Sequence, residues 1–422
     1  MMPREPLLSA ISIVDLESAN PAMALQPHRY QHLLDWLSRS AFSDMDVPQL
    51  QNELIGHLEN LGMRFYRMHI GLPMLHPLYS IGTYTWGPDQ GVVLDNFQRG
   101  LAGKASWKES PLRPFYEDGS VEGRITIRAG SESDRFSILK SAAENGATDY
   151  FVQFTNFPDR SIPVDAQEGI ALTWTSNAPG GFAEEALEVL RAIRLPLCAQ
   201  LKNLTHRRLV DDILAAYLGP YSGKRVRDGQ IQRGDGDVID AVILFCDLRG
   251  SSTLAEHYDL DGFLTVLNDY YEITAGAVIE EGGEILRYIG DASLAIFPFE
   301  RYEPEQKACQ YALRAALQAA ARGREVNADR RARGEPAIDF GIGLHVGQVM
   351  YGNIGTPKRI EFTVIGQAAN EAARIEAQCK ELGETILVSD RFAELLNHPW
   401  KSHGAFTLRN IGRPIEIYSP VS

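Results

Sequence analysis

Cysteine is scarce in this 422-residue chain, and the few cysteines present are far apart. They lie at Cys198, Cys246, Cys309 and Cys379, and no two of them form a Cys-x-x-Cys pair. This spacing excludes a zinc site built on paired cysteines and also excludes a disulfide framework. It fits a protein of the reducing cytoplasm, where we expect this chain to be located.

Long apolar runs and runs of basic residues are also absent. No apolar run is long enough to cross a bilayer, so we expect no membrane insertion. A formal net charge of −14 without a Lys/Arg-rich run argues against nucleic acid as a partner. A nucleotide is not excluded, because it requires only a local cluster of positive charge. The short apolar run at 7–14 is followed by Asp15 and Glu17, so we interpret residues 1–25 as a flexible tail rather than a secretion signal.

The length favours two or three domains. Helical spacing at 28–39 and 47–61 precedes segments rich in aromatic and β-branched residues, with one further helical segment at 136–144. This order predicts an α+β domain over residues 26–182. A long helix is predicted over 183–218, followed by a Gly- and charge-rich linker at 219–237. Leu197, Leu201 and Leu204 have coiled-coil spacing, which is typical both of packing on the helix's own domain and of a dimer interface.

The remaining residues, 238–422, predict a second α+β domain. Strands are expected at 238–246, 284–289 and 293–297, helices at 261–281 and 305–325, and a pair of strands at 338–346 and 348–351 around a glycine. A short strand at 362–365, a helix at 367–379 and strands at 386–389 and 414–418 complete the pattern. The order βαββαβ, with additions, predicts a ferredoxin-like core.

Two acidic residues in this domain follow apolar strands. Asp247 directly follows the strand 238–246 and precedes a Gly/Ser loop and the start of a helix. This arrangement can hold a metal and phosphates together. Asp291 lies in a turn with apolar residues on both sides. Asn370 and Arg374 are four residues apart and share one face if their segment is helical. Together these residues suggest metal-assisted phosphoryl chemistry, although each alone has an ordinary structural role as a cap, turn or surface residue.

Four sequence blocks carry a family resemblance. They are Phe245-Cys-Asp-Leu-Arg-Gly250, Gly282-Gly-Glu-Ile-Leu-Arg-Tyr-Ile-Gly-Asp291, Gly341-Ile-Gly-Leu-His-Val-Gly-Gln-Val349 with Gly352-Asn-Ile-Gly355, and Phe362-Thr-Val-Ile-Gly-Gln-Ala-Ala-Asn-Glu-Ala-Ala-Arg374. With these blocks in this order, the C-terminal domain resembles the catalytic domain of class III nucleotidyl cyclases, close to the soluble bacterial adenylate cyclases.

The resemblance implies conversion of ATP to 3′,5′-cyclic AMP and pyrophosphate. It implies that Asp247 and Asp291 each ligate two Mg²⁺ or Mn²⁺ ions, with the backbone carbonyl of Leu248 as a further ligand. Arg374 is then expected to stabilise charge at the α-phosphate, and Asn370 to hold the ribose. The remaining phosphates are expected to contact the backbone of Gly250, Ser251 and Ser252 and one of two arginines, Arg409 or Arg413, between which the sequence does not choose.

Base recognition is where this chain departs from the family pattern. Adenylate cyclases usually have lysine four residues before the second metal aspartate, where this chain has Arg287, and guanylate cyclases usually have glutamate there. Thr363, at the partner position, fits adenine. The resemblance therefore favours ATP and disfavours GTP, while a pyrimidine nucleotide cyclase of the phage-defence type remains an alternative. A catalytically silent nucleotide-binding or dimerisation module is less favoured, because the chain keeps both aspartates, the asparagine and the arginine.

The resemblance also implies assembly and regulation. In the family, the metal residues come from one subunit and the asparagine and arginine from the other, so we expect a head-to-tail homodimer with shared sites. The domain at 26–182 resembles GAF sensory domains, and we expect an unidentified small-molecule or protein effector to act there and gate the dimer through the helix at 183–218. His69, His76 and Trp86 lie on the predicted strands of this domain, where core packing is the expected role of each.

Overall fold

The computed structural model describes residues 27–74, 78–98, 107–157 and 168–421, and it divides into two compact units, Met1–Val210 and Asp211–Ser422. The predicted tail at 1–25 and His76 lie outside the described residues. Within the described part of the chain, no helix has the length and apolarity that a membrane span requires. The four cysteines are all buried and free, as their spacing predicts.

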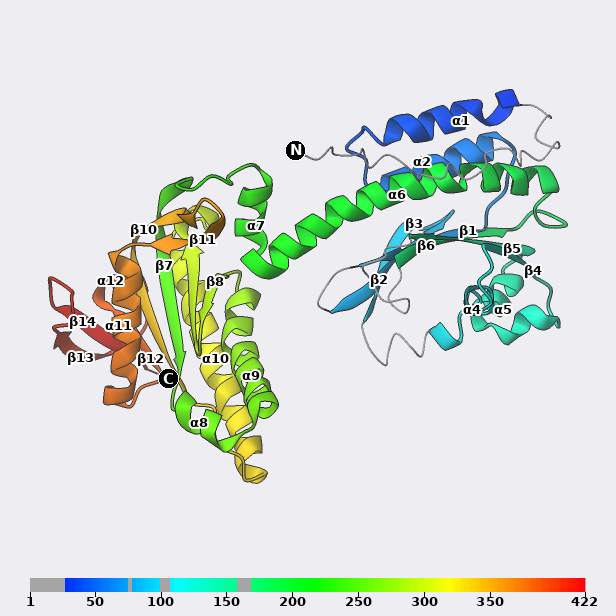
Figure 1. The fold of residues 1–422 in the computed structure, drawn as a ribbon. Helices are drawn as coiled ribbons and strands as arrows, with labels where there is room; N and C mark the ends of the chain where they lie inside the picture. The colour runs from blue at the N-terminus through cyan, green and yellow to red at the C-terminus, as the bar shows by residue number, and fades with distance from the viewer. Residues whose placement is uncertain (1–26, 75–77, 99–106, 158–167, 422) are drawn as a thin grey trace, which may run out of the picture. The chain divides into compact units, whose positions relative to one another are not determined.

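The N-terminal unit is built on a six-stranded antiparallel sheet in the order β3-β2-β1-β6-β5-β4. Its strands are β1 (Arg67–Pro73), β2 (Tyr79–Gly87), β3 (Gly91–Gln98), β4 (Glu122–Thr126), β5 (Asp149–Phe157) and β6 (Glu168–Ser176). Its helices are α1 (Pro27–Ser40), α2 (Val47–Asn60), α4 (Arg113–Glu117), the 3₁₀ helix η2 (Glu132–Arg135), α5 (Ser137–Glu144) and most of α6 (Glu184–Leu218). Helices α1, α2 and α6 cover one face of the sheet and α4 and α5 lie on the other (Figure 1).

The alternation expected of strands explains this layering. Met68, Ile70 and Leu72 of β1 point to the face covered by α2 and α6, and all three are buried. α2 begins with a capping box between Asp46 and Gln49. The α+β architecture of this unit is therefore confirmed, and its resemblance to GAF domains stays a prediction.

The leucines with coiled-coil spacing belong to this core. Leu197, Leu201 and Leu204 of α6 are buried in the cluster that also contains the sheet residues Leu172 and Trp174. Their spacing therefore reflects packing on their own domain, the first of the two interpretations that the sequence left open.

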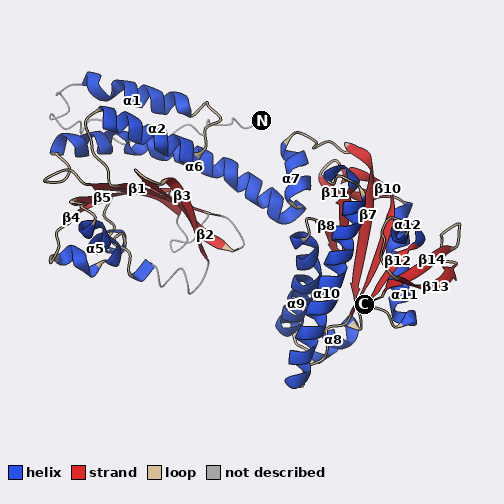
Figure 2. Cartoon of the chain, turned by 180° about the vertical axis from the view of Figure 1, so that it is seen from behind, coloured by secondary structure: helices blue, strands red, loops and turns tan. Residues whose placement is uncertain are grey.

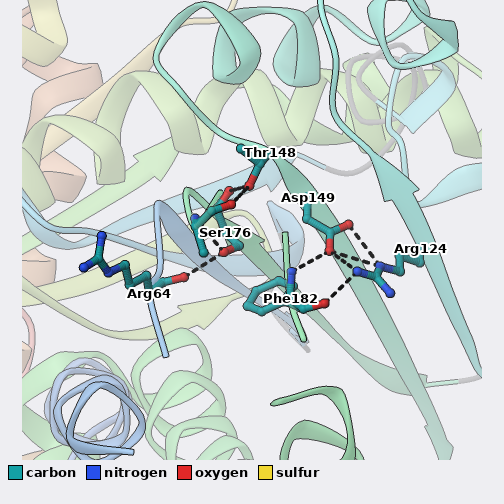
Figure 3. Close-up of polar contacts among 7 residues, drawn as sticks. Arg64, Arg124, Thr148, Asp149, Ser176 and Phe182 are labelled. Atoms are coloured by element: carbon teal, nitrogen blue, oxygen red, sulfur yellow. Dashed lines mark hydrogen bonds and ion pairs between the residues drawn. The ribbon is translucent and has the colours of Figure 1, made fainter. Parts of the chain in front are cut away.

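A polar network fastens the start of α6 to the sheet (Figure 3). The buried carboxylate of Asp149 accepts hydrogen bonds from the Arg124 guanidinium, at 2.7 Å, and from the Phe182 backbone N–H, at 2.9 Å. Arg124 also donates to the Phe182 carbonyl, and its pKa is raised mainly by the hydrogen bond to Asp149. Nearby, the hydroxyls of Thr148 and Ser176 donate to backbone carbonyls, that of Ser176 to Arg64. The loop before α6 is thus held by directional contacts.

The C-terminal unit has a larger sheet in the order β13-β14-β12-β10-β7-β9-β8, with β11 pairing on β10 (Figure 2). Its strands are β7 (Gly236–Leu248), β8 (Glu284–Ile289), β9 (Ala292–Pro298), β10 (Phe340–Thr356), β11 (Arg359–Ile365), β12 (Ile386–Ser389), β13 (Trp400–Phe406) and β14 (Ile415–Pro420). Its helices are α7 (Pro220–Arg227), α8 (Ser251–His257), α9 (Leu260–Glu280), η4 (Phe299–Arg301), α10 (Gln306–Ala332), α11 (Gln367–Leu382) and α12 (Asp390–Ala393). α9 and α10 share one core cluster with the sheet, and α11 packs against its other face.

Two predictions for this unit are corrected. The strand pair expected at 338–346 and 348–351 is one continuous strand, β10, which pairs with β7 without interruption from Phe340 to Gly352. Gly347 does not mark a turn: a Cβ there would lie 2.6 Å from the Ala368 side chain of α11, so glycine lets the helix approach the strand.

The second correction concerns the expected linker at 219–237. It contains α7, which packs on the C-terminal unit through the buried Ser222. The Ser222 N–H and hydroxyl donate to the Glu284 carboxylate at 2.8 and 2.7 Å. Glu284 is itself buried and also accepts from Arg301 at 2.7 Å. The glycines and charged residues of this segment suggested a linker, but Ser222 pairs with a buried carboxylate of the C-terminal unit and so anchors α7 there.

Candidate active site

The two aspartates come together at one end of the sheet. β7 and β9 are antiparallel neighbours, and Asp247 pairs with Ala292. Asp291 is the residue immediately before β9, in the turn from β8. The Leu248 backbone N–H donates to the Asp291 carbonyl at 3.3 Å. The arrangement therefore places Asp247, near the end of β7, beside Asp291 in the turn before β9.

These carboxylates fit a cation site. The pKa of Asp247 is raised, first by burial and then by the negative charge of Asp291. A divalent cation between them would offset that repulsion, and carboxylate and carbonyl oxygens are the ligands that Mg²⁺ and Mn²⁺ prefer. Among the described residues no group of three or more His, Cys, Asp or Glu side chains forms a metal cluster. The donor set is thus two carboxylates with backbone oxygen, which suits hard cations that keep some of their water.

A third carboxylate lies close to this pair. Glu376 of α11 is buried, and burial, together with the charge of Asp247, raises its pKa to about 7. Sequence analysis missed this residue because it lies in a helix far along the chain, outside the matching positions. Only the packing of α11 on β10 brings it near Asp247.

Hydrogen bonds from the backbone and the side chain of Arg249 fix the loop after Asp247. The Arg249 N–H donates to the Asp339 carbonyl at 2.7 Å, and its guanidinium donates to the Glu384 carbonyl at 2.6 Å. Gly250 then adopts a left-handed conformation with φ of 66°, which favours glycine, and α8 begins at Ser251. The turn at Gly250, three residues after Asp247, thus leads into α8.

The two residues expected to recognise the nucleotide base, Arg287 and Thr363, lie near each other. Arg287 of β8 forms an ion pair with Glu361 of β11, and Thr363 is two residues further along the same strand. Thr363 is buried opposite Gly352 of β10. Glu361 is a second residue that sequence analysis missed. It leaves Arg287 with an acidic partner beside the expected base position.

Asn370 and Arg374 share the exposed face of α11. Ala372 and Ile375 of the same helix are fully buried against the sheet, whereas Asn370 and Arg374 are exposed. Neither side chain has a hydrogen bond or ion pair with any residue that the structure describes. One chain thus presents two sets of polar groups, the paired aspartates and the outward-facing Asn370 and Arg374.

The two C-terminal arginines differ in their surroundings. Arg413 forms an ion pair with Asp390 at the start of α12, at 3.3 Å. Arg409 is exposed between β13 and β14. Because Arg413 already has a carboxylate partner, Arg409 is the freer of the two cations.

Comparisons with known proteins identify a related family. Residues 237–417 match the family described as "Adenylate and Guanylate cyclase catalytic domain". A curated relative from Anabaena cylindrica, named adenylate cyclase, is 34% identical over 243 residues, which cover 56% of this chain and 45% of that protein. The chain spans less than half the length of the curated relatives it matches.

Solved cyclase structures also align with this chain. The adenylyl cyclase CyaB from P. aeruginosa is 23% identical, with a TM-score of 0.41, over 44% of this chain and 96% of that one. The guanylyl cyclase Cya2 is 28% identical, with a TM-score of 0.38, over 43% of this chain and 92% of that one. By its match to the family model, the segment 237–417 of this chain is assigned to the class III adenylate and guanylate cyclase catalytic domains.

Proposed function

We propose that this protein is an adenylate cyclase that converts ATP to 3′,5′-cyclic AMP and pyrophosphate. The observation that carries the proposal is the presence, in one domain of this family, of both the paired aspartates and the exposed Asn370 and Arg374. A domain that had lost catalysis would have no need to keep a repulsive carboxylate pair at a strand end.

The aspartates and the Leu248 carbonyl are assigned to metal binding. Two Mg²⁺ or Mn²⁺ ions, when bound, would lower the pKa of the ribose 3′-hydroxyl and offset the charge of the departing pyrophosphate. Asp247, near the end of β7, and Asp291, in the turn before β9, would hold these ions. The backbone of Gly250, Ser251 and Ser252 is assigned to the β- and γ-phosphates, with Arg409 as the better candidate for added positive charge.

Asn370 and Arg374 are assigned to the ribose and the α-phosphate of the nucleotide. Arg374 has an exposed guanidinium without an intrachain carboxylate partner among the described residues. It is therefore available to stabilise the charge that develops at the α-phosphate. Asn370, one helical turn earlier, is assigned to the ribose, which it orients for attack in line with the leaving group.

Because Asn370 and Arg374 face away from the core of their own domain, we propose that they complete the site of a second copy. A head-to-tail homodimer related by a two-fold axis has two equivalent sites of this kind. Each site takes its aspartates from one copy and its Asn370 and Arg374 from the other. A monomer is then expected to be inactive.

Base choice is assigned to Arg287 and Thr363. The ion pair with Glu361 holds the Arg287 guanidinium beside β11, where it can donate to an acceptor nitrogen of adenine while the Thr363 hydroxyl contacts the exocyclic amine. Glutamate, the residue usual in guanylate cyclases, is absent from position 287. A pyrimidine nucleotide is the second candidate, because an arginine donor also suits the carbonyl oxygens of cytosine and uracil.

The test is turnover of the purified full chain with Mn²⁺ and each of ATP, GTP, CTP and UTP in parallel. Cyclic AMP from ATP, with at least about tenfold lower kcat/KM for the other three, is the expected result, since one well-placed hydrogen-bonding pair discriminates by about 1–3 kcal/mol. A cyclic pyrimidine product would replace the adenine assignment. No product from any nucleotide in a dimeric sample would favour the silent-module alternative.

We also propose that the N-terminal unit regulates the dimer through α6, in response to an effector. Deleting residues 1–210 is expected to change specific activity at least severalfold, because it removes the sensory unit while keeping the C-terminal unit whole. Cutting at residue 180 instead would expose the buried leucines of α6. Unchanged activity in the 211–422 fragment, compared at equal dimer concentration, would contradict the regulatory role.

A further inference from the structure

A buried polar cluster lies beneath the exposed face of α11. Nε2 of His345, in β10, is 2.6 Å from Oε2 of Glu371 in α11. Nδ1 of His345 is 2.8 Å from the hydroxyl of Ser389, which also caps α12. His345 and Ser389 are fully buried and Glu371 is nearly so. The imidazole is thus hydrogen-bonded to the end of β12 through Nδ1 and lies in ion-pair contact with α11 through Nε2.

The second oxygen of Glu371 is occupied as well. The Gln367 side-chain amide, one turn earlier in α11, donates to Oε1 of Glu371 at 3.1 Å. The contact with His345 holds the pKa of Glu371 below its ordinary value, with smaller contributions from the charges of Arg413 and Arg391. Glu371 therefore stays ionised although it is buried, and His345 is the group that makes this burial tolerable.

The other contacts of this interface are mainly apolar, and the buried Glu376, near Asp247, is a second polar group in it. Ala368, Ala372 and Cys379 face the sheet, and a Cβ at Gly343 would lie 2.4 Å from the Ala372 carbonyl. Flat contacts of this kind set the distance between α11 and β10 but oppose sliding or rotation weakly. A buried polar contact is directional, and leaving one partner unsatisfied costs about 1–3 kcal/mol. The pair of His345 and Glu371 is therefore a directional contact that opposes rotation of α11 next to Asn370.

That rotation sets the direction of the functional side chains. Glu371 is the residue immediately after Asn370 and precedes Arg374 by three. We propose that His345 and Glu371 are positioning residues, which fix α11 so that Asn370 and Arg374 meet the nucleotide bound by a second copy of this chain. This inference rests on the proposed function and adds to it a determinant buried in the copy that supplies Asn370 and Arg374.

The first test compares Glu371→Ala with Glu371→Gln. Glu371→Ala is expected to lower kcat about 10- to 100-fold with little change in KM, because a displacement of about 1 Å in a positioning group costs up to about 10²-fold. Glu371→Gln keeps an oxygen facing His345 and is expected to retain kcat within about fivefold. Ser389→Ala, which frees one side of the ring without touching α11, is expected to lower kcat in the same direction as Glu371→Ala.

Cys379→Ala is the matched control. Cys379 is fully buried in the same helix–sheet interface, two turns beyond Glu371. Its truncation is expected to lower the melting temperature without lowering kcat, since the polar contact remains. Equal losses of kcat in Cys379→Ala and Glu371→Ala would show that general loosening of α11, rather than this pair, causes the effect, and would overturn the proposal.

Mixed dimers then show which half of the shared site the Glu371→Ala substitution damages. Glu371→Ala mixed with Asp291→Ala is expected to regain activity, because one site of each mixed dimer has an intact metal half and an intact Asn370–Arg374 half. Glu371→Ala mixed with Asn370→Ala is expected to stay inactive, because both changes damage the same half. Recovery with Asn370→Ala, or full kcat in a folded Glu371→Ala dimer, would overturn the positioning role. Absence of turnover in the unmutated dimer would instead overturn the proposed function itself.

Discussion

Replacing Asp291 by alanine is expected to lower kcat by about 10³-fold or more, because it removes half of the carboxylate pair that holds the ions. The carbonyl of Asp291 accepts the Leu248 N–H through the backbone, which alanine retains. The fold of the strand ends should therefore survive, and the melting temperature should not fall. Removing Asp291 also removes the negative charge that, after burial, raises the pKa of Asp247.

The measurement is single-turnover formation of cyclic nucleotide with saturating Mn²⁺. Asp261→Ala, an exposed aspartate in the first turn of α9, is the matched control and should leave kcat unchanged. A loss of less than about tenfold in Asp291→Ala would contradict the assignment of this residue to the metal site, since even a residue that only orients a metal ligand typically costs about 10- to 100-fold.

Replacing Arg374 by alanine is expected to lower kcat by about 10²- to 10³-fold, because the residue stabilises charge that appears only during reaction. KM should change much less than kcat, since the guanidinium contributes little to binding of the ground state. Stability should also be unaffected, because Arg374 is exposed and no described residue pairs with it. Steady-state kinetics and thermal unfolding of the full chain measure these three quantities.

Lys380→Ala is the control for Arg374→Ala. Lys380 is an exposed cation near the end of the same helix, so its removal changes the net charge equally without touching the expected site. If both variants lost activity to the same extent, the effect would be a general one of surface charge rather than a role for Arg374 in the site.

Residues whose roles depend on local pattern were predictable from the sequence. Asp247 follows an apolar run and precedes a Gly/Ser loop, and β7 ends at Leu248, one residue beyond it. The spacing of Asn370 and Arg374 predicts a shared helix face, and both are exposed on α11. Periodicity and turn residues report on such neighbours because the determining contacts lie within a few residues.

Features that depend on contacts between distant segments were not predictable. Glu361 meets Arg287 only because β8 and β11 are brought together by the sheet. Glu371 and His345 are separated in sequence by a strand and a turn, and each alone resembles a surface residue. Gly347 resembled a turn signal because the sequence does not show that a helix approaches the strand there. In each case a long-range packing contact, rather than local propensity, decides the role.

Mixing two inactive variants tests the proposed dimer with shared sites most directly. Asp291→Ala and Arg374→Ala would be unfolded or dissociated together, reassociated in equal amounts and assayed for cyclic nucleotide. Random pairing puts about half of the chains in mixed dimers with one intact site of two, so we predict about a quarter of the unmutated activity. Activity no higher than that of either variant alone, with mixed dimers demonstrated by mass, would contradict the shared site.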